Sequence, residues 1–267
     1  MDADLLVIGA LTFVIHLIGT LAYGVRIAGT RTHRIALSLS LFNLLILVSR
    51  TSNAFQAPLL AKRIEENLSA GSTGGGLADF RWLLASATAA TLVGAFLIPT
   101  FQRLLSTSVD AYGRRRSILA MLRGAASPAL AAHVREAAVL PRWANVTEAR
   151  GRPHIPWSVA ALNCAAMAVW SVGVFAALYA GYLRPDLRVT ASQMSAVVNG
   201  VATILMFAFI DPYLSMMADD VAAGAVDEPY FRRSVVWLTG SRLAGTVLAQ
   251  LILVPAALWI AAVAEWL

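Results

Sequence analysis

Arg50 has the clearest chemical potential in this sequence, because it places a charge directly after an apolar stretch. The 14 mostly apolar residues 35–48 that precede it are too few to cross a bilayer core of about 30 Å. If the helix continues to about residue 60, Arg50 lies within the membrane, roughly 22 Å from Ile35. A guanidinium with hydroxyl and amide neighbours suits a phosphate, which accepts bidentate hydrogen bonds from arginine. The candidate binding residues around Arg50 are Asn43, Ser49, Thr51, Ser52, Asn53 and Gln56.

Helical spacing divides this polar segment between two faces. Asn43, Arg50 and Asn53 can share one face. Ser49, Asn53 and Gln56 can share another. Because a charged side chain at the bilayer centre costs about 2.5–3.5 kcal/mol on insertion scales, we expect Arg50 to face a protein interior or a hydrated cavity. The alternative is that the membrane span ends at Ser49 and that Arg50 extends its side chain to the outer surface.

A second polar stripe is expected in the first apolar stretch. His16 lies midway along it, with Thr20 and Tyr23 at i+4 and i+7 on the same helical face. Arg26 follows nearer the end of the stretch, and all four are candidate substrate contacts. His16 is either a hydrogen-bonded packing residue or a proton carrier, and the sequence leaves both roles open.

Charged residues also gather where the fifth and sixth apolar stretches meet. Asp211, Asp219 and Asp220 lie near the end of the fifth stretch. Arg242 lies about two turns into the sixth. One interpretation is an ion pair between Arg242 and Asp211 or Asp219 that locks the two helices together. The sharper interpretation is a gate in which Arg242 exchanges a carboxylate for a substrate phosphate.

The sequence contains no enzyme signature. The four histidines lack a metal-binding spacing such as HExxH, and no Gly-x-Ser-x-Gly occurs. Asp219-Asp220 lacks the third aspartate of a DDxxD motif, and the glycine-rich residues 71–76 lack the Gly-Lys-Ser/Thr ending of a phosphate-binding loop. Since Cys164 is the single cysteine, neither an intramolecular disulfide nor a cysteine-based zinc site can form. We therefore expect no metal, no cofactor and no enzymatic activity.

Membrane-spanning helices must position these residues. The chain of 267 residues is 58% hydrophobic and 13% charged, whereas soluble domains average about 25% charged residues. Because a span needs roughly 20 apolar residues, six windows qualify: about 5–27, 35–60, 80–105, 157–183, 191–217 and 235–264. We predict an all-α polytopic membrane protein of about six transmembrane helices that forms a single transmembrane domain over residues 1–267.

The basic residues predict how the spans are oriented. Of the 21 Lys and Arg residues, 14 lie in or beside the first, third and fifth loops and six in or beside the second and fourth. Because cytoplasmic loops are enriched in Lys and Arg, both termini are expected to be extracytoplasmic. We interpret the scattered basic residues as orientation signals and phosphate partners, and we expect no nucleic-acid binding. The acidic start Met1-Asp2-Ala3-Asp4 is unlike a secretory signal, so the first span is expected to be retained.

Residues 106–156 form a long loop that is predicted to be cytoplasmic. Arg114-Arg115-Arg116 precedes an amphipathic stretch, and Ser127-Pro128 suits the start of a helix running to about Leu140. We expect short amphipathic helices at the membrane surface with their arginines toward anionic lipids, and docking of a partner is the alternative.

Three spans on each side of this loop are compatible with two halves of inverted orientation, as in many transporters. Aliphatic runs in the third and sixth spans both end in proline, at Pro99 and Pro255. Such runs are also common in unrelated membrane helices, so the repeat is an open hypothesis.

Three stretches carry a resemblance to a known family. The strongest is residues 38–60, SLSLFNLLILVSRTSNAFQAPLL, and the second is His16 to Tyr23, followed by Arg26-Ile27-Ala28-Gly29 and Arg31-Thr32. A weaker match in the sixth span comprises Arg242, Gly245-Thr246, Gln250 and Pro255-Ala256-Ala257. On these residues the chain resembles the Amj family of bacterial membrane proteins, and Gln250 joins the gating candidates.

This resemblance implies a lipid II flippase, the alternative to MurJ, in the bacterial cytoplasmic membrane. Its substrate would be an undecaprenyl-diphosphate-linked peptidoglycan precursor, moved from the inner to the outer leaflet. The resemblance brings no assigned set of functional residues, so the site candidates rest on membrane depth and chemistry.

A lipid with a diphosphate between a polyprenyl chain and a sugar-peptide headgroup needs a cavity that is cationic, polar and open to lipid. Arg50 in the outer half, with Arg26 and Arg242 in the inner half, would offer phosphate partners at two depths. We therefore expect alternating access between these depths. This mechanism requires Arg50 to share a cavity with His16 or Arg242.

Two other functions stay open at this point. A polyprenyl-phosphate phosphatase or transferase would use Asp211, Asp219, Asp220 and His16 together with a divalent metal. A non-transporting membrane scaffold would act through the basic third loop. The sequence predicts neither the oligomeric state nor the energy source of transport.

Overall fold

The membrane-spanning part of the protein is helical. The structure is a computed structural model, and it describes residues 2–71, 76–115, 129–144, 146–147 and 155–267. Within these residues six helical segments are long and apolar enough to cross a membrane and no strand occurs, which confirms the predicted fold class. Five of these segments are α1 (Ala3–Thr32), α2 (Ile35–Ser69), α3 (Gly76–Arg115), α7 (Trp157–Leu183) and α10 (Glu228–Trp266).

The fifth of the six spans in chain order is interrupted. It comprises the 3-10 turn η1 (Pro185–Leu187), α8 (Arg188–Leu205), the π-helical turn η2 (Met206–Ile210) and α9 (Asp211–Ala222). Pro212 explains the interruption, because proline has no backbone N–H and its ring clashes with the carbonyl four residues earlier. Single π-helical turns are frequent at functional sites. Because η2 ends directly before Asp211, the interruption sets the position of a predicted gating residue.

The helices extend farther than the apolar windows that predict them. α2 continues through Arg50 to Ser69, so the helix itself does not end at Ser49. α3 continues to Arg115, and residues 106–115 of the predicted loop are therefore helical. A helix keeps its backbone hydrogen bonds beyond the hydrocarbon core, and a hydropathy window does not detect such polar ends.

The third loop is described only in part. α5 (Ala129–Ala137) lies within it and is a short helix of nine residues. Ser127-Pro128, the predicted start of this helix, lies outside the described residues, as do Arg116 and the amphipathic stretch predicted to follow it.

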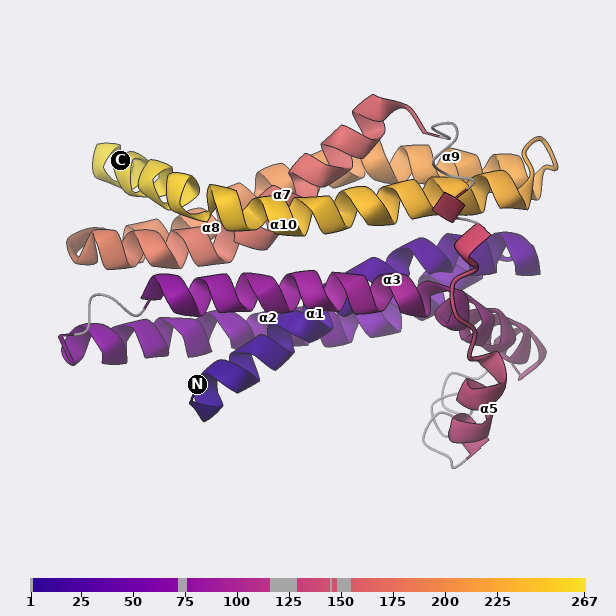
Figure 1. Cartoon of the computed structure of the whole chain (residues 1–267), viewed down its shortest axis with the longest axis horizontal. Coiled ribbons are helices and arrows are strands. Elements are labelled where there is room, and N and C mark those ends of the chain that lie inside the picture. Colours follow the sequence, from indigo (N-terminus) through magenta and orange to yellow (C-terminus); the bar gives the residue numbers. More distant parts are fainter. Residues whose placement is uncertain (1, 72–75, 116–128, 145, 148–154) are drawn as a thin grey trace.

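Packing divides the protein into two halves with the same internal order. α1 packs mainly on α3 and α2, while α2 contacts α3 only slightly. In the second half α7 packs mainly on α10 and α8, while α8 contacts α10 only slightly. α1–α3 lie in the lower part of Figure 1 and α7–α10 in the upper part, with both chain termini toward the same end. This repeated order supports the hypothesis of two three-span halves.

We name the two ends of the molecule by their contents. The terminus end holds the first residues of α1 and the last residues of α10. The basic end holds the loops after α1, α3 and α9, which are the loops predicted to be cytoplasmic. Figure 1 places the terminus end at the left and the basic end at the right.

Apolar side chains form two separate cores, one toward each end. The core at the terminus end includes Leu5, Phe80 and Leu253. The core at the basic end includes Val25 and Phe231. Between these cores the chain buries polar side chains from four helices, among them Thr12, His16, Thr20, Gln56, Asn163, Arg242 and Thr246. We call this set of residues the central polar layer.

Candidate functional site

The central polar layer is built on one face of α1. Thr12, His16, Thr20 and Tyr23 recur at intervals of four, four and three residues, and all four side chains are buried. This spacing keeps them on one side of the helix. The structure therefore confirms that the predicted face of His16, Thr20 and Tyr23 points into protein.

Arg242 brings a positive charge into this layer from the other half of the molecule. Its side chain is buried, with 4% of the residue exposed. Nε donates to Thr20 Oγ1 at 3.1 Å and Nη1 to Met167 Sδ at 3.0 Å. Neither acceptor is charged, and no carboxylate of the described chain pairs with Arg242. A buried guanidinium without a counter-ion costs several kcal/mol, about 3 by insertion scales, so its presence calls for a ligand or a function.

The backbone of α1 makes room for this side chain. A Cβ atom on Gly19 would collide with Nη2 of Arg242. Because glycine has no side chain, the guanidinium can lie directly against α1. His16, one turn away, is buried and its Nδ1 has no hydrogen-bond partner among the described residues. The layer thus holds a buried cation on α10 and an unsatisfied ring nitrogen on α1.

Asn163 of α7 connects the same layer to both halves. Its Oδ1 accepts a hydrogen bond from Tyr23 OH at 3.0 Å. Its Nδ2 donates to Leu238 O at 2.9 Å and to Ser241 Oγ at 2.8 Å. Asn163 was absent from the sequence-based candidates. The signal that could have found it is an amide about two turns into an otherwise apolar span.

α2 contributes only part of its polar segment to the interior. Ser52 and Gln56 are buried, and Gln56 Nε2 donates to Thr12 Oγ1, one turn of α1 from His16. Ser49 is half-buried and Asn53 is exposed, so Ser49, Asn53 and Gln56 do not share one environment as predicted.

The other predicted stripe of α2 lies on its outer face. Asn43, Arg50 and Asn53 are all exposed, as is Thr51, so the predicted common face of the first three exists. It does not point into the central polar layer, and Arg50 lines neither of the two described cavities. Helical periodicity alone cannot tell which side of a polar segment a neighbouring helix covers. Arg50 is thus exposed on the outer face of α2, whereas His16 and Arg242 are buried in the central polar layer.

Ion pairs at the basic end connect the two halves in a different way from the predicted one. Arg26 Nη2 lies 3.0 Å from Asp211 Oδ1, and Arg31 Nε lies 2.6 Å from Glu228 Oε1. Asp211 therefore pairs with Arg26, and the predicted pair with Arg242 is wrong. The reason is depth, because Arg242 lies roughly 21 Å from the start of α10, beside the middle of α1.

The remaining acidic candidates lie apart from Arg242. Asp219 and Asp220 are exposed near the end of α9. Among the described residues no three His, Cys, Asp or Glu side chains come together in a group that could hold a metal ion. The acidic set proposed for a metal-dependent enzyme, Asp211, Asp219, Asp220 and His16, is therefore not assembled.

Polar contacts also close the terminus end. Arg63 of α2 lies 2.7 Å from Asp79 of α3 through Nε and 2.6 Å from Asp2 through Nη1. This guanidinium, with a backbone N–H from Leu5, holds the pKa of the Asp2 carboxyl below its usual range. Asn67 Nδ2 donates to Tyr182 OH at 2.9 Å and so joins α2 to α7 across the two halves.

Gln250, the last gating candidate, contacts the other half by a single hydrogen bond. Its Nε2 donates to the backbone carbonyl of Arg81 on α3 at 2.8 Å. It lies about two turns from Arg242 along α10 and belongs to the contact between α10 and α3.

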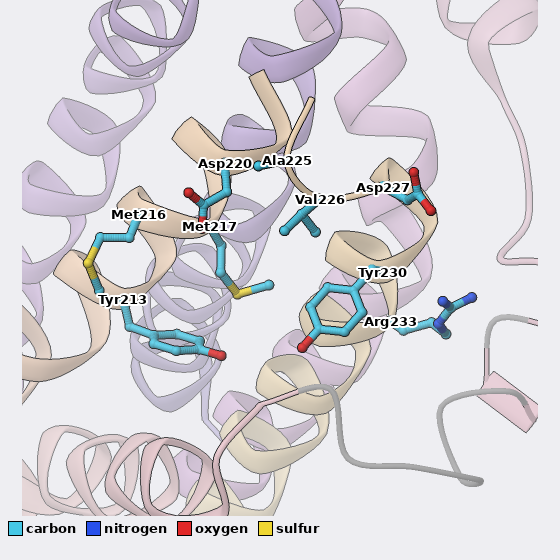
Figure 2. A pocket seen from close by; sticks show the side chains of 9 residues that line it. All are labelled: Tyr213, Met216, Met217, Asp220, Ala225, Val226, Asp227, Tyr230 and Arg233. Carbon is cyan, nitrogen blue, oxygen red and sulfur yellow. The ribbon is translucent and has the colours of Figure 1, made fainter. Parts of the chain in front are cut away.

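Two cavities stand out among the described residues. The first, of about 500 Å³, lies between α9 and α10 at the basic end. Figure 2 shows the rings of Tyr213 and Tyr230 facing it, with Met217 between them and Asp220 above. The second, of about 520 Å³, lies between α7 and α10 and has an almost entirely apolar wall. Arg242 lines neither cavity, and its burial together with that of His16 and Thr20 shows that this part of the central polar layer is closed to solvent in this conformation.

The fold and the site define a polytopic α-helical membrane protein whose two halves enclose a buried cation. The model of the Amj family, described as "Alternate to MurJ", matches residues 11–264. The chain belongs to this family, as its resemblance implied. A relative from Bacillus subtilis (strain 168), the lipid II flippase Amj, is 36% identical over 269 residues, which is 100% of this chain and 98% of the relative. No solved structure matches the chain significantly.

Proposed function

We propose that this protein is a lipid II flippase, which moves the undecaprenyl-diphosphate-linked precursor from the inner to the outer leaflet of the bacterial cytoplasmic membrane. Similarity to a relative with that name over the whole chain supports the substrate. The observation that carries the mechanism is the buried Arg242, which lacks a carboxylate partner in the described chain.

Arg242 is the proposed contact for the diphosphate. A guanidinium binds phosphate oxygens through charge-assisted and often bidentate hydrogen bonds. In the closed conformation Nε and Nη1 are held by a hydroxyl and a thioether, and a thioether is a weak acceptor. A diphosphate would therefore replace weak partners by strong ones. The gain offsets the cost of bringing the lipid headgroup to this depth.

The polar residues around Arg242 suit the rest of the headgroup. Thr12, Gln56, Tyr23 and Asn163 supply hydroxyl and amide groups between two apolar cores. Sugars and peptides bind through such donors and acceptors. These groups now bond to one another, and they would exchange these partners for the substrate when the layer opens.

Arg50 is proposed as a second phosphate contact on the outer face of α2. It shares that exposed face with Asn43 and Asn53. An exposed guanidinium at membrane depth is costly unless water, a headgroup or a ligand surrounds it. A route for the headgroup along this face would provide such surroundings. Arg50 would then be a second cation, in addition to Arg242, that the phosphates contact.

Alternating access is the proposed way to reach these contacts. Arg26–Asp211 and Arg31–Glu228 join the halves at the basic end, and Asn67–Tyr182 joins them at the terminus end. Opening one end while the other stays paired would expose the central polar layer to one leaflet at a time. Asp211 would act in the gate through Arg26, and Gln250 through its bond to α3.

The basic end is proposed to face the cytoplasm. Lys and Arg are concentrated in and beside its loops, and anionic lipids of the inner leaflet attract such segments. Arg135 of α5 lies in the last turn of a short helix that is mostly exposed, as expected for a segment at the membrane surface.

The test is Arg242→Gln in cells that depend on this protein for lipid II export. Glutamine keeps hydrogen-bond donors but removes the charge, so export should fall roughly 10- to 100-fold, since hydrogen bonds to charged groups contribute about 1.5–3 kcal/mol. Arg242→Lys should also be impaired, because an ammonium cannot form the bidentate contact. Arg103→Gln, a change to an exposed arginine on α3, is the matched control and should export normally.

Normal export by Arg242→Gln at normal expression would exclude the proposed role of Arg242. Purified protein in liposomes separates transport from the enzyme alternative. Leaflet exchange of intact lipid II without any headgroup product supports the flippase, whereas turnover of the headgroup supports a phosphatase or transferase.

A further inference from the structure

The apolar cavity between α7 and α10 is a groove on the side of the molecule. Its volume is about 520 Å³, and it lies in two helices that are apolar enough to cross the membrane. Small side chains form much of its wall, including Ala161, Ala165, Gly240 and Ala244. The groove is therefore an apolar trough between two helices that could cross the membrane, and Val146 of the third loop adds to its wall.

Close approach of the two helices produces this trough. A Cβ atom on Gly245 would lie 2.5 Å from the carbonyl oxygen of Cys164 and 2.8 Å from Cβ of Met167. The backbones thus touch at Gly245, and the small residues beside this crossing leave space that neither helix fills. In most membrane proteins small residues at a crossing let helices pack closely. In this protein the small residues next to the crossing form the wall of an open space.

The groove has the length of one lipid leaflet. Its lining on α10 extends from Val236 to Leu248, which is roughly 18 Å at 1.5 Å per residue. Half of a hydrocarbon core of about 30 Å is about 15 Å. Trp157 and Trp237 lie at the basic end of the groove, and tryptophan is enriched where a membrane meets water.

The groove is next to the central polar layer. Ser241 is part of its wall and accepts a hydrogen bond from Asn163 Nδ2 at 2.8 Å. Asn163 Oδ1 in turn accepts from Tyr23 OH at 3.0 Å. Arg242, the next residue along α10, turns to the opposite side and contacts Thr20. A lipid can therefore have its chain in the groove while its phosphate group lies one helix width away, at Arg242.

We infer that this groove binds the isoprenoid chain of the diphosphate lipid during transport. The inference rests on the proposed function for the identity of the lipid. The shape and lining favour a long hydrocarbon chain that lies parallel to α10, and the neighbouring polar layer favours a chain attached to a charged headgroup. The groove would keep the chain in the membrane and beside the protein while the headgroup crosses the central polar layer.

Photo-crosslinking tests this binding directly. The full-length protein in nanodiscs is irradiated with undecaprenyl diphosphate that carries a diazirine in its chain, and the crosslinked peptides are identified by mass spectrometry. We expect crosslinks in residues 157–165 and 236–248, and competition by excess undecaprenyl diphosphate but not by phosphatidylglycerol. Crosslinks mainly on the exposed faces of α2 or α8, or equal crosslinking by a diazirine phospholipid, would overturn the inference.

Filling the groove tests its role in transport. Ala161 and Ala244 are exposed in the groove, so phenylalanine at both positions adds bulk without entering either core. The Ala161→Phe/Ala244→Phe variant should lose the groove crosslinks and transport lipid II roughly tenfold more slowly, because the added rings occupy the space of the chain. Ala262→Phe, at an exposed position elsewhere on α10, should behave as wild type.

These outcomes separate the inference from the proposed function. Normal transport and normal crosslinking by the filled variant would reject the groove while the flippase function stands. Absence of transport by the wild-type protein, together with groove crosslinks, would reject the function but retain the chain-binding site.

Discussion

Arg242 Nε donates a hydrogen bond to Thr20 Oγ1 across 3.1 Å, so a guanidinium of α10 is held by a hydroxyl of α1, 222 residues away in the chain. The contact joins the two halves of the molecule at the level of the central polar layer. Thr20 has a second bond, because its hydroxyl donates to the carbonyl of His16 at 2.8 Å. A donor to the backbone and an acceptor for the cation are thus combined in one side chain.

Thr20→Val tests the strength of this contact. Valine has nearly the shape of threonine but cannot accept the hydrogen bond, so the buried guanidinium loses a partner. We expect the free energy of unfolding in detergent to fall by about 1–3 kcal/mol. Thr91→Val is the matched control, because Thr91 is also buried and bonds its own helix at Ala87 O but contacts no cation. Equal losses of unfolding free energy for the two variants would show that the hydrogen bond from Arg242 to Thr20 does not stabilise the protein.

Gly19→Ala tests whether α1 must leave room for the guanidinium. The added Cβ would collide with Nη2 of Arg242, so the cation should shift from its position and lipid II export should fall. Alanine at a helical glycine with free space around its Cβ position has the opposite effect, since it favours the helix by about 1 kcal/mol. Gly200→Ala, where a Cβ would meet nothing within 4 Å, is therefore the control. Export by Gly19→Ala at the wild-type rate would contradict this account of the site.

The pair Arg26–Asp211 is expected to couple the two halves at the basic end. A double-mutant cycle with Arg26→Gln and Asp211→Asn should give a coupling energy of about 0.5–1 kcal/mol, because Asp211 is partly exposed. The same cycle with Arg242→Gln and Asp211→Asn should give none. A coupling of Asp211 to Arg242 that exceeds its coupling to Arg26 would restore the gate first predicted from the sequence.

Labelling of introduced cysteines tests the proposed orientation. In a Cys164→Ser background, Glu66→Cys lies at the exposed end of α2 and Ala225→Cys in the turn between α9 and α10. A membrane-impermeant maleimide added to whole cells should label the first and not the second, because the basic end is proposed to face the cytoplasm. The reverse pattern would invert the direction of every step proposed above.

Patterns along single helices were predictable from the sequence. The six spans follow from apolar windows, and the buried face of His16, Thr20 and Tyr23 follows from helical spacing. Both are local properties, because the length of a span and the period of a helix involve one segment at a time.

Relations between helices were not predictable in the same way. The partner of Asp211 is Arg26, and a choice between Arg26 and Arg242 depends on how deep each helix lies against its neighbour. The inward face of α2 is that of Ser52 and Gln56, and its polar residues surround the helix too evenly for one face to be preferred. Asn163 was missed because a single amide in an apolar span has little weight in a hydropathy count.

Arg50 offers the sharpest separation of function from stability. Its side chain is exposed on the outer face of α2, and it forms no hydrogen bond or ion pair with the described residues. Arg50→Ala should therefore change the free energy of unfolding by less than about 0.5 kcal/mol, as expected of a surface substitution. Lipid II export should nevertheless fall roughly tenfold, because a phosphate contact is lost.

Two further variants complete this test of Arg50. Arg50→Lys should also be impaired, since a point charge cannot form the bidentate contact with a phosphate. Lys62→Ala removes an exposed cation on the same helix, whose ion pair within the described residues is with Glu66 at 3.6 Å, and should export normally. If Arg50→Ala exports normally at normal expression, the exposed stripe of α2 is no part of the substrate route. Arg242 would then be the one arginine of this pair that contacts the diphosphate, and the headgroup would have to cross between α1, α7 and α10.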